Sequence, residues 1–118
     1  MRALRGATTV ERDTVEQVTE RVQELLRELM GRNDLLEEDV ISIVFTATAD
    51  VVSMFPATAA RGIGFGDVPL LCAAEIPVPG SKPLCIRILM HVSTTLARAE
   101  LRHVYLHGAQ GLNDGLPS

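Results

Sequence analysis

The chain has 118 residues and a formal net charge of −4, and 47% of its residues are hydrophobic. This size and composition predict one domain, residues 1–118, with an aliphatic core. The negative charge argues against a nucleic-acid partner. The sequence shows no signal peptide, basic amphipathic helix or apolar run of about 20 residues, which argues against a membrane partner. Cys72 and Cys85 lie in apolar segments without metal-ligand spacing, so we interpret them as reduced thiols of a cytoplasmic protein.

The first expected elements are a strand and an amphipathic helix. The first nine residues alternate mildly and predict a short strand, on which Arg5, taken alone, is a solvated edge charge. A helix should begin with a capping box at Asp13 or Thr14 and end at Gly31–Asn33. Its charged face, Arg21 included, is expected in solvent, and its apolar stripe should lie on a sheet. The stripe consists of Val15, Val18, Val22, Leu25, Leu26, Leu29 and Met30.

A second strand and a second helix are expected next. The acidic segment Asp34–Asp39 suits one helical turn, and the β-branched segment Val40–Ala47 predicts a buried strand. Pro56 suits the first turn of a helix that starts at Phe55 and carries Arg61 near its end. The order of elements up to this point is strand, helix, strand, helix.

Two apolar runs form the centre of the sequence, one from Val68 to Glu75 and one from Leu84 to Met90. A connection rich in proline and glycine joins them, so we predict two strands that face each other across a turn. Their near-continuous apolar character is typical of strands buried on both faces. The second run carries one charge, Arg87, and burying an unpaired charge costs several kcal/mol. In one interpretation, Glu75 forms a structural ion pair with Arg87. In the other, an anionic ligand binds Arg87 in a pocket, and Glu75 makes a separate contact to that ligand.

The remaining chain predicts a loop over Ser93–Ala99 and a last short strand over Leu101–His107. Residues 110–118 should form a loosely ordered tail unless a ligand or partner holds them. These elements predict an α+β fold of βαβαββ order, with a mixed β-sheet and helices on one face. A single helix layer leaves the other face uncovered, so we expect the chain to cover it by oligomerising.

Several kinds of chemistry lack support in the sequence. His103 and His107 are four residues apart in a predicted strand without a carboxylate or cysteine cluster, so we expect no metal site. The glycines at 62–66 end a helix and lead into a strand, whereas a phosphate-binding loop follows a strand and precedes a helix. The sequence also contains no motif typical of a catalytic nucleophile. We therefore expect no cofactor. The remaining polar candidates suit electrostatic stabilisation of a small polyanion, and they are Arg5, Arg61, Cys72, Glu75, Arg87 and Tyr105.

These residues and their neighbours resemble the monofunctional chorismate mutases of the Bacillus type, from Arg2 to about Leu106. The motifs LRGATTVE near the N-terminus and LRHVYL near the C-terminus are specific, and they occur in the expected order. The resembling segments are Leu4–Glu11, Phe55–Ala57 with Arg61, Val68–Glu75, Cys85–Arg87 and Leu101–Leu106.

The resemblance implies a homotrimer that forms a pseudo-α/β barrel, with active sites in clefts between neighbouring subunits. It also implies the conversion of chorismate to prephenate by a pericyclic Claisen rearrangement, a step in phenylalanine and tyrosine biosynthesis. That reaction needs no cofactor, proton transfer or covalent intermediate.

The resemblance also implies roles for individual residues. Arg87 matches the arginine at the ether oxygen of the substrate, and Glu75 matches the carboxylate that accepts its ring hydroxyl. Cys72 matches a thiol near that same end, while Arg5 and Tyr105 match a pair that binds a carboxylate end. The other implied substrate-binding residues are Leu71, Ala73 and Ala74 in the cleft wall and Phe55, Ala57 and Arg61 from the adjacent subunit.

The sequence departs from the family pattern at two places. The family usually has a lysine where this chain has Thr58, and an Arg-Pro pair after the position of Leu112, where this chain has Asn113-Asp114. We therefore expect weaker substrate capture by the tail, with the chemistry intact. Two other interpretations remain, namely a trimeric metabolite-binding or imine-deaminase-like protein with an Arg-lined cleft, and an inactive structural trimer.

Overall fold

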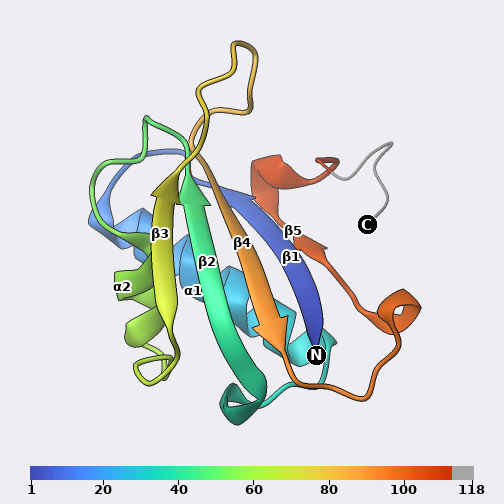
Figure 1. Cartoon of the computed structure of the whole chain (residues 1–118). Coiled ribbons are helices and arrows are strands. Elements are labelled where there is room, and N and C mark those ends of the chain that lie inside the picture. Colours follow the sequence, from blue (N-terminus) through green and yellow to red (C-terminus); the bar gives the residue numbers. More distant parts are fainter. Residues whose placement is uncertain (113–118) are drawn as a thin grey trace.

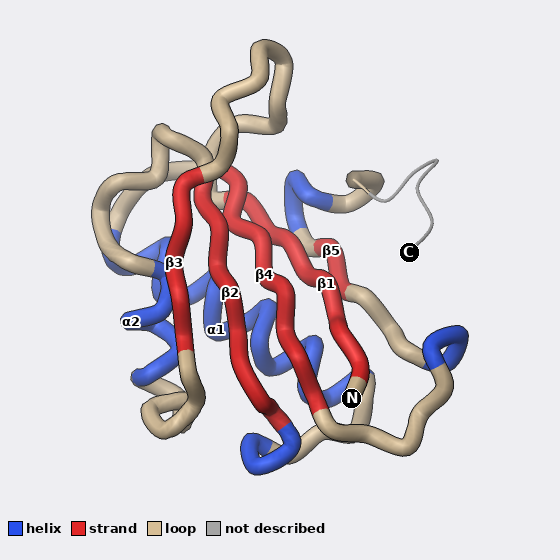
Figure 2. Tube along the Cα trace, in the orientation of Figure 1, coloured by secondary structure: helices blue, strands red, loops and turns tan. Residues whose placement is uncertain are grey.

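A five-stranded mixed sheet forms the centre of the structure, a computed structural model that describes residues 1–112 (Figure 1). Its strands are β1 (Arg2–Thr9), β2 (Val40–Ala47), β3 (Leu70–Ala74), β4 (Cys85–Val92) and β5 (Val104–Tyr105). Helices α1 (Val15–Arg32) and α2 (Pro56–Arg61) pack on one face of the sheet (Figure 2). Short 3-10 turns lie at Glu37–Asp39, Arg98–Glu100 and His107–Ala109. The predicted α+β class, with its mixed sheet and its helices on one face, is confirmed.

The strand order is β3-β2-β4-β1-β5, which places β4 in the middle of the sheet. β4 pairs antiparallel with β1 and with β2, while β3 pairs parallel with β2 and β5 pairs parallel with β1. The prediction that the two central apolar runs face each other is therefore wrong, because β2 lies between them. β1 and β2 occupy both edges of β4, so β3 pairs along the outer edge of β2 instead.

The expected burial of both runs on both faces is also wrong. Most residues of β3 are exposed, and Leu71 is 62% exposed, because β3 is an edge strand with helices on one side only. The central strand β4 is better covered. Its residues Ile86, Ile88 and Met90 are buried toward the helices, whereas Leu89 on the opposite face is 38% exposed.

The start of α1 shows which of the two predicted caps forms. Thr14 is the N-cap residue, and its Oγ1 accepts a hydrogen bond from the backbone N–H of Gln17 at 3.2 Å. Asp13 instead accepts hydrogen bonds from the backbone N–H groups of Val52 and Ser53, at 3.0 and 3.1 Å. Asp13 therefore ties the start of α1 to the loop before α2. These hydrogen bonds lower the pKa of the Asp13 carboxyl.

Arg21 departs from the solvated face predicted for α1. Its side chain is almost completely buried, and Nη1 donates a hydrogen bond to the carbonyl oxygen of Thr9 at 2.5 Å. Its Nη2 lies 3.6 Å from a carboxylate oxygen of Glu11. The chain between β1 and α1 thus lies over this guanidinium, a tertiary contact that helical periodicity does not reveal.

The last strand is shorter than the predicted Leu101–His107. β5 pairs only with Gly6 and Ala7 of β1, and His107 then adopts a φ of +51°. That left-handed conformation turns the chain out of the strand and into a 3-10 turn. The expectations for the tail at 113–118, Asn113-Asp114 included, concern residues outside the described part of the chain.

Candidate active site

The face of the sheet opposite α1 and α2, here called the open face, carries most of the predicted charged residues. On β4, Arg87 lies opposite Thr46 of β2 and opposite Ala7 of β1, and Ala7 in turn lies opposite Tyr105 of β5. Residues directly opposite each other project to the same face, so these four form one row across the sheet. Arg5 belongs to the next row of the same face, opposite a residue of β4.

A cavity of about 420 Å³ lies over these rows and is called the open-face cavity below. Arg5, Arg87 and Tyr105 line it, so three predicted catalytic residues meet within one chain. Charges in such largely apolar surroundings interact more strongly than in water. The other lining residues are Gly6, Ala7, Val44, Thr46, Ile88, Leu89 and Leu112.

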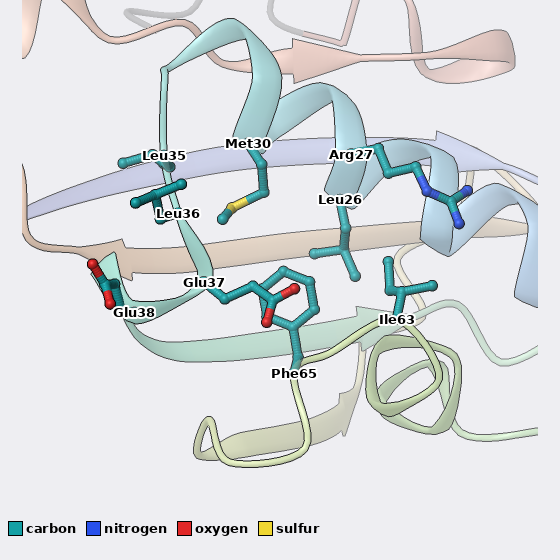
Figure 3. A pocket seen from close by; sticks show the side chains of 9 residues that line it. All are labelled: Leu26, Arg27, Met30, Leu35, Leu36, Glu37, Glu38, Ile63 and Phe65. Atoms are coloured by element: carbon teal, nitrogen blue, oxygen red, sulfur yellow. The ribbon is translucent and has the colours of Figure 1, made fainter.

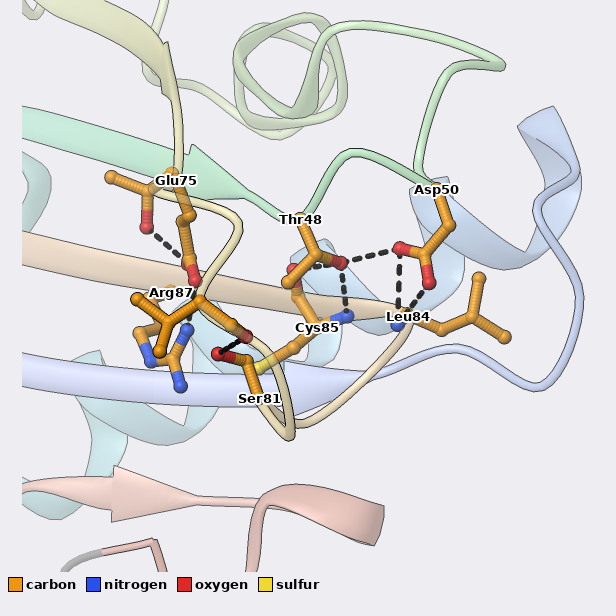
Figure 4. Close-up of polar contacts among 9 residues, drawn as sticks. Thr48, Asp50, Glu75, Ser81, Leu84, Cys85 and Arg87 are labelled. Carbon is orange, nitrogen blue, oxygen red and sulfur yellow. Dashed lines mark hydrogen bonds and ion pairs between the residues drawn. The ribbon is translucent and has the colours of Figure 1, made fainter.

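Glu75 follows β3 directly and forms an ion pair with Nη1 of Arg87 (Figure 4). Thr46 Oγ1 donates a hydrogen bond to the other carboxylate oxygen of Glu75 at 2.6 Å. Burial alone would lower the pKa of Arg87, but the hydrogen bond to Glu75 and the charges of Cys85, Glu75 and Tyr105 together raise that pKa above its usual value. The guanidinium therefore stays charged, with its position fixed by Glu75.

This ion pair agrees with the first interpretation of Arg87 and leaves room for the second. The Arg87 side chain is 39% exposed and that of Glu75 is 15% exposed. Only Nη1 contacts Glu75, and within residues 1–112 the guanidinium makes no other hydrogen bond. An anion in the open-face cavity can therefore bind Arg87 without displacing Glu75.

Two polar side chains after β2 fix the start of β4 (Figure 4). Thr48 Oγ1 accepts a hydrogen bond from the backbone N–H of Cys85 at 3.0 Å. Both carboxylate oxygens of Asp50 accept from the backbone N–H of Leu84, at 3.1 and 3.0 Å. Leu84 has a φ of +49°, which residues other than glycine adopt rarely, so these bonds hold it in an unfavourable conformation. Arg87 follows Leu84 by three residues, so the position of Arg87 depends on these hydrogen bonds to Thr48 and Asp50.

Cys72 borders a different cavity, of about 710 Å³, beside α2. It lies opposite Phe45, which is completely buried under the helices, and it packs partly against the core. Its side chain is therefore on the helix-covered face, on the other side of the sheet from the open-face cavity. Ala73, Ala74 and the 71% exposed Phe55 line the same cavity as Cys72.

The three remaining predicted residues are spread over the chain. Leu71 lies on the open face opposite Val44, in the same row as Arg5. Ala57 is buried in α2 as part of the core, and Arg61 is exposed at the end of α2. Within one chain, neither Ala57 nor Arg61 lines the two cavities described above. The single chain thus divides the predicted site between the open-face cavity and the cavity beside α2.

A further cavity, of about 660 Å³, lies on the helix-covered side beside α1 (Figure 3). None of the predicted site residues lines it, and its rim has two carboxylates but one guanidinium. It therefore offers no surplus of positive charge to a polyanion. Its lining residues are Leu26, Arg27, Met30, Leu35, Leu36, Glu37, Glu38, Ile63 and Phe65.

Thr46 is a site residue that sequence reasoning missed. Its hydroxyl holds Glu75, and it lies opposite Arg87 in the sheet. In the sequence it is only a polar residue at the end of an apolar strand. Its role depends on the register between two strands, which the periodicity of a single strand does not determine.

The arrangement suits the binding of negative charge, and Glu75 holds the Arg87 guanidinium in place beforehand. Fixed guanidinium groups stabilise a transition state in which negative charge grows, because they need no reorganisation as the reaction proceeds. Among the described residues, no group of three or more His, Cys, Asp or Glu side chains is placed to hold a metal ion. No helix in this part of the chain is long and apolar enough to cross a membrane.

Comparisons with known proteins point to one family. The family model for "Chorismate mutase type I" matches residues 1–116. The chorismate mutase AroH of Thermus thermophilus is 44% identical over 119 residues, which cover 100% of this chain and 98% of that protein. AroH of Bacillus subtilis (strain 168) is 41% identical over 107 residues, with 90% and 84% covered. A solved chorismate mutase from Clostridium thermocellum matches with a TM-score of 0.91 at 46% identity, covering 93% of this chain and 98% of the other.

Proposed function

The chain belongs to the type I chorismate mutase family, and from that premise we propose that it isomerises chorismate to prephenate. The observation that carries the proposal is the Arg87 guanidinium, which Glu75 holds beside a cavity that Arg5 and Tyr105 also line. The metabolite-binding or imine-deaminase-like alternative is not favoured, because the family match and both relatives carry the chorismate mutase name.

The proposed reaction breaks a C–O bond and forms a C–C bond in one pericyclic step. Negative charge grows on the ether oxygen as the C–O bond lengthens. A guanidinium beside that oxygen stabilises the transition state more than the substrate, and such differential binding raises kcat. We assign this role to Arg87, because its pKa is raised and its guanidinium has N–H groups beyond the one that contacts Glu75.

The other residues bind and orient the dianionic substrate. We assign a carboxylate end of the substrate to Arg5 and Tyr105, and the ring hydroxyl to Glu75. The segment from Leu71 to Glu75 borders the cleft, with Leu71 on the open face. The Cys72 side chain faces the cavity beside α2, so it does not contact substrate bound at Arg87 of its own chain. A shaped cleft also selects the compact, pseudo-diaxial conformer in which the reacting atoms are close, which lowers the entropic part of the barrier.

The proposal includes a homotrimer in the cytoplasm, with each active site between two subunits. Leu71 and Leu89 expose apolar surface on the open face, and association would remove that surface from water. The adjacent subunit would then supply the exposed Phe55 and Arg61 to the cleft, while Ala57, which is buried in the core of its own chain, would support the same helix. The product would serve phenylalanine and tyrosine biosynthesis.

One assay tests the activity directly. Purified protein should consume chorismate, followed by the loss of its ultraviolet absorbance, and prephenate should be the sole product by chromatography. An Arg87→Ala preparation made in parallel controls for contaminating enzymes and should be nearly inactive. Unchanged chorismate, or another product, would contradict the proposal.

The pH dependence of the same assay tests the mechanism. Because the reaction needs no general base, kcat should be nearly constant around neutral pH. A bell-shaped profile governed by a histidine-like pKa would show that proton transfer limits the reaction, against the electrostatic mechanism.

A further inference from the structure

A cavity rich in arginine, here called the basic cavity, lies at the end of the open face near the N-terminus. It has a volume of about 430 Å³ and lies between the start of β1, the end of β4 and the segment that leads to β5. Arg5 lines both this cavity and the open-face cavity, so the two are neighbours. The lining residues are Met1, Arg2, Ala3, Arg5, His91, Arg98, Leu101 and His103.

The charge of the basic cavity is opposite to that of the whole chain. Three arginines, Arg2, Arg5 and Arg98, border it and no acidic residue does, although the chain has a net charge of −4. Among residues 1–112, neither Arg2 nor Arg98 forms an ion pair with a carboxylate. Arginines that border one cavity repel each other, and an anion bound there would offset that repulsion.

Several donors around the basic cavity are already held in position. The backbone N–H of Arg5 donates to His103 Nδ1 at 2.9 Å, so the neutral His103 ring carries its own proton on Nε2. His91 Nδ1 lies 3.2 Å from Ser42 Oγ, and Arg2 Nε donates to a backbone carbonyl oxygen at 3.2 Å. Groups positioned in advance lose less conformational entropy when a ligand binds.

We propose that the basic cavity binds a small oxyanion with two negative charges, and that this anion regulates the neighbouring active site through Arg5. Phosphates and dicarboxylates share this chemistry, because guanidinium groups bind both with paired N–H donors. A bound anion attracts Arg5, which then holds the substrate carboxylate less firmly. The KM for chorismate should therefore rise while kcat stays the same. This kinetic effect rests on the proposed function, whereas anion binding does not.

Sulfate is a suitable probe, because it keeps a charge of −2 throughout the neutral range. Calorimetric titration of the intact protein, at an ionic strength held constant with sodium chloride, should show saturable binding at one site per chain. Separate titrations with inorganic phosphate and with malonate then distinguish the two classes, and the tighter binder identifies the class of the natural ligand. The absence of saturable binding for all three anions would overturn the proposal.

A matched pair of variants tests the location of the site. Arg98→Ala removes an exposed guanidinium from the basic cavity and should weaken sulfate binding roughly fivefold or more. Arg102→Ala makes the same change in charge four residues away, at an exposed position that lines a different cavity, and should leave the affinity unchanged. Equal weakening by both variants would show a general charge effect and overturn the assignment.

The same pair tests the regulation. Sulfate should raise the KM for chorismate in the wild type and in Arg102→Ala, and much less in Arg98→Ala. If Arg98→Ala is inhibited as strongly as the wild type, sulfate acts in the active site and the regulatory role is wrong. If no preparation turns over chorismate, the proposed function fails, while the titrations still decide whether the basic cavity binds anions.

Discussion

The two faces of the sheet consist of alternate residues of the same strands, yet they serve different purposes. On β4, Ile86, Ile88 and Met90 are buried under the helices, whereas Arg87 and Leu89 on the open face are partly exposed. The helix-covered face supplies an aliphatic core, and the open face combines fixed charges with exposed apolar surface. Because side chains alternate along a strand, adjacent residues should affect different measurements when they are substituted.

The largest expected effect on stability is at the helix-covered face. Phe45 is completely buried, so Phe45→Ala should reduce the free energy of unfolding by about 3–5 kcal/mol, measured by chemical denaturation. The adjacent Val44 lies on the open face, and Val44→Ala should cause less than half that loss. Equal losses in the free energy of unfolding would contradict the assignment of the core to the helix-covered face.

The open face should instead control association. In the proposed trimer, Leu89→Asp would bury an unpaired carboxylate, which costs several kcal/mol, so sedimentation velocity should show monomers with their secondary structure retained. Val15→Asp is the control, because Val15 is an exposed apolar residue in the first turn of α1. A Leu89→Asp protein that sediments like the wild type would exclude this face from the subunit interface.

A smaller effect is expected where the open face positions its charges. Thr46→Val removes the hydroxyl that donates to Glu75 with little change in shape, and kcat/KM should fall roughly tenfold. The free energy of unfolding should change little. Thr95→Val, in an exposed loop, is the matched control and should be fully active. Full activity of Thr46→Val would show that Glu75 is held without Thr46.

The smallest expected effect concerns pH and the edge of the open face. Burial, together with the nearby charge of Arg5, lowers the pKa of His103 below its usual 6.5. The unfolded chain therefore binds more protons at mildly acid pH, so this part of the stability is present above about pH 6.5 and lost as the pH falls through the lower, folded pKa.

His103→Asn provides the comparison, because it keeps an acceptor near the position of Nδ1 but does not titrate. Between pH 7 and pH 5, the free energy of unfolding should fall more steeply in the wild type than in this variant. Parallel curves would exclude His103 as a source of the acid sensitivity.

Local patterns predicted the elements well, because they depend on neighbours in the sequence. The stripe on α1, apart from the exposed Val15, and the β-branched segment of β2 appear where the sequence places them, and of the two predicted caps the one at Thr14 forms. Pairing between strands was harder, because alternation does not say which edges meet. For that reason β2 was not expected between β3 and β4, and the burial of Arg21 under the chain before α1 was missed.

In the candidate site, too, some residues could be predicted from the sequence and others depend on strand pairing. The resemblance identified Arg5, Arg87 and Tyr105, and the structure brings them to one cavity. It could not identify Thr46, whose contact with Glu75 follows from strand register alone. The opposite sides of the sheet taken by Cys72 and Arg87 likewise follow from three-dimensional packing, which the spacing of residues does not determine.

The central claim is that the Arg87 guanidinium stabilises negative charge on the ether oxygen in the transition state. The most direct test is kcat of Arg87→Lys, which keeps the charge but loses the planar array of donors. We predict a fall in kcat of at least about a hundredfold, with the free energy of unfolding nearly unchanged. A kcat close to that of the wild type would contradict this role for Arg87.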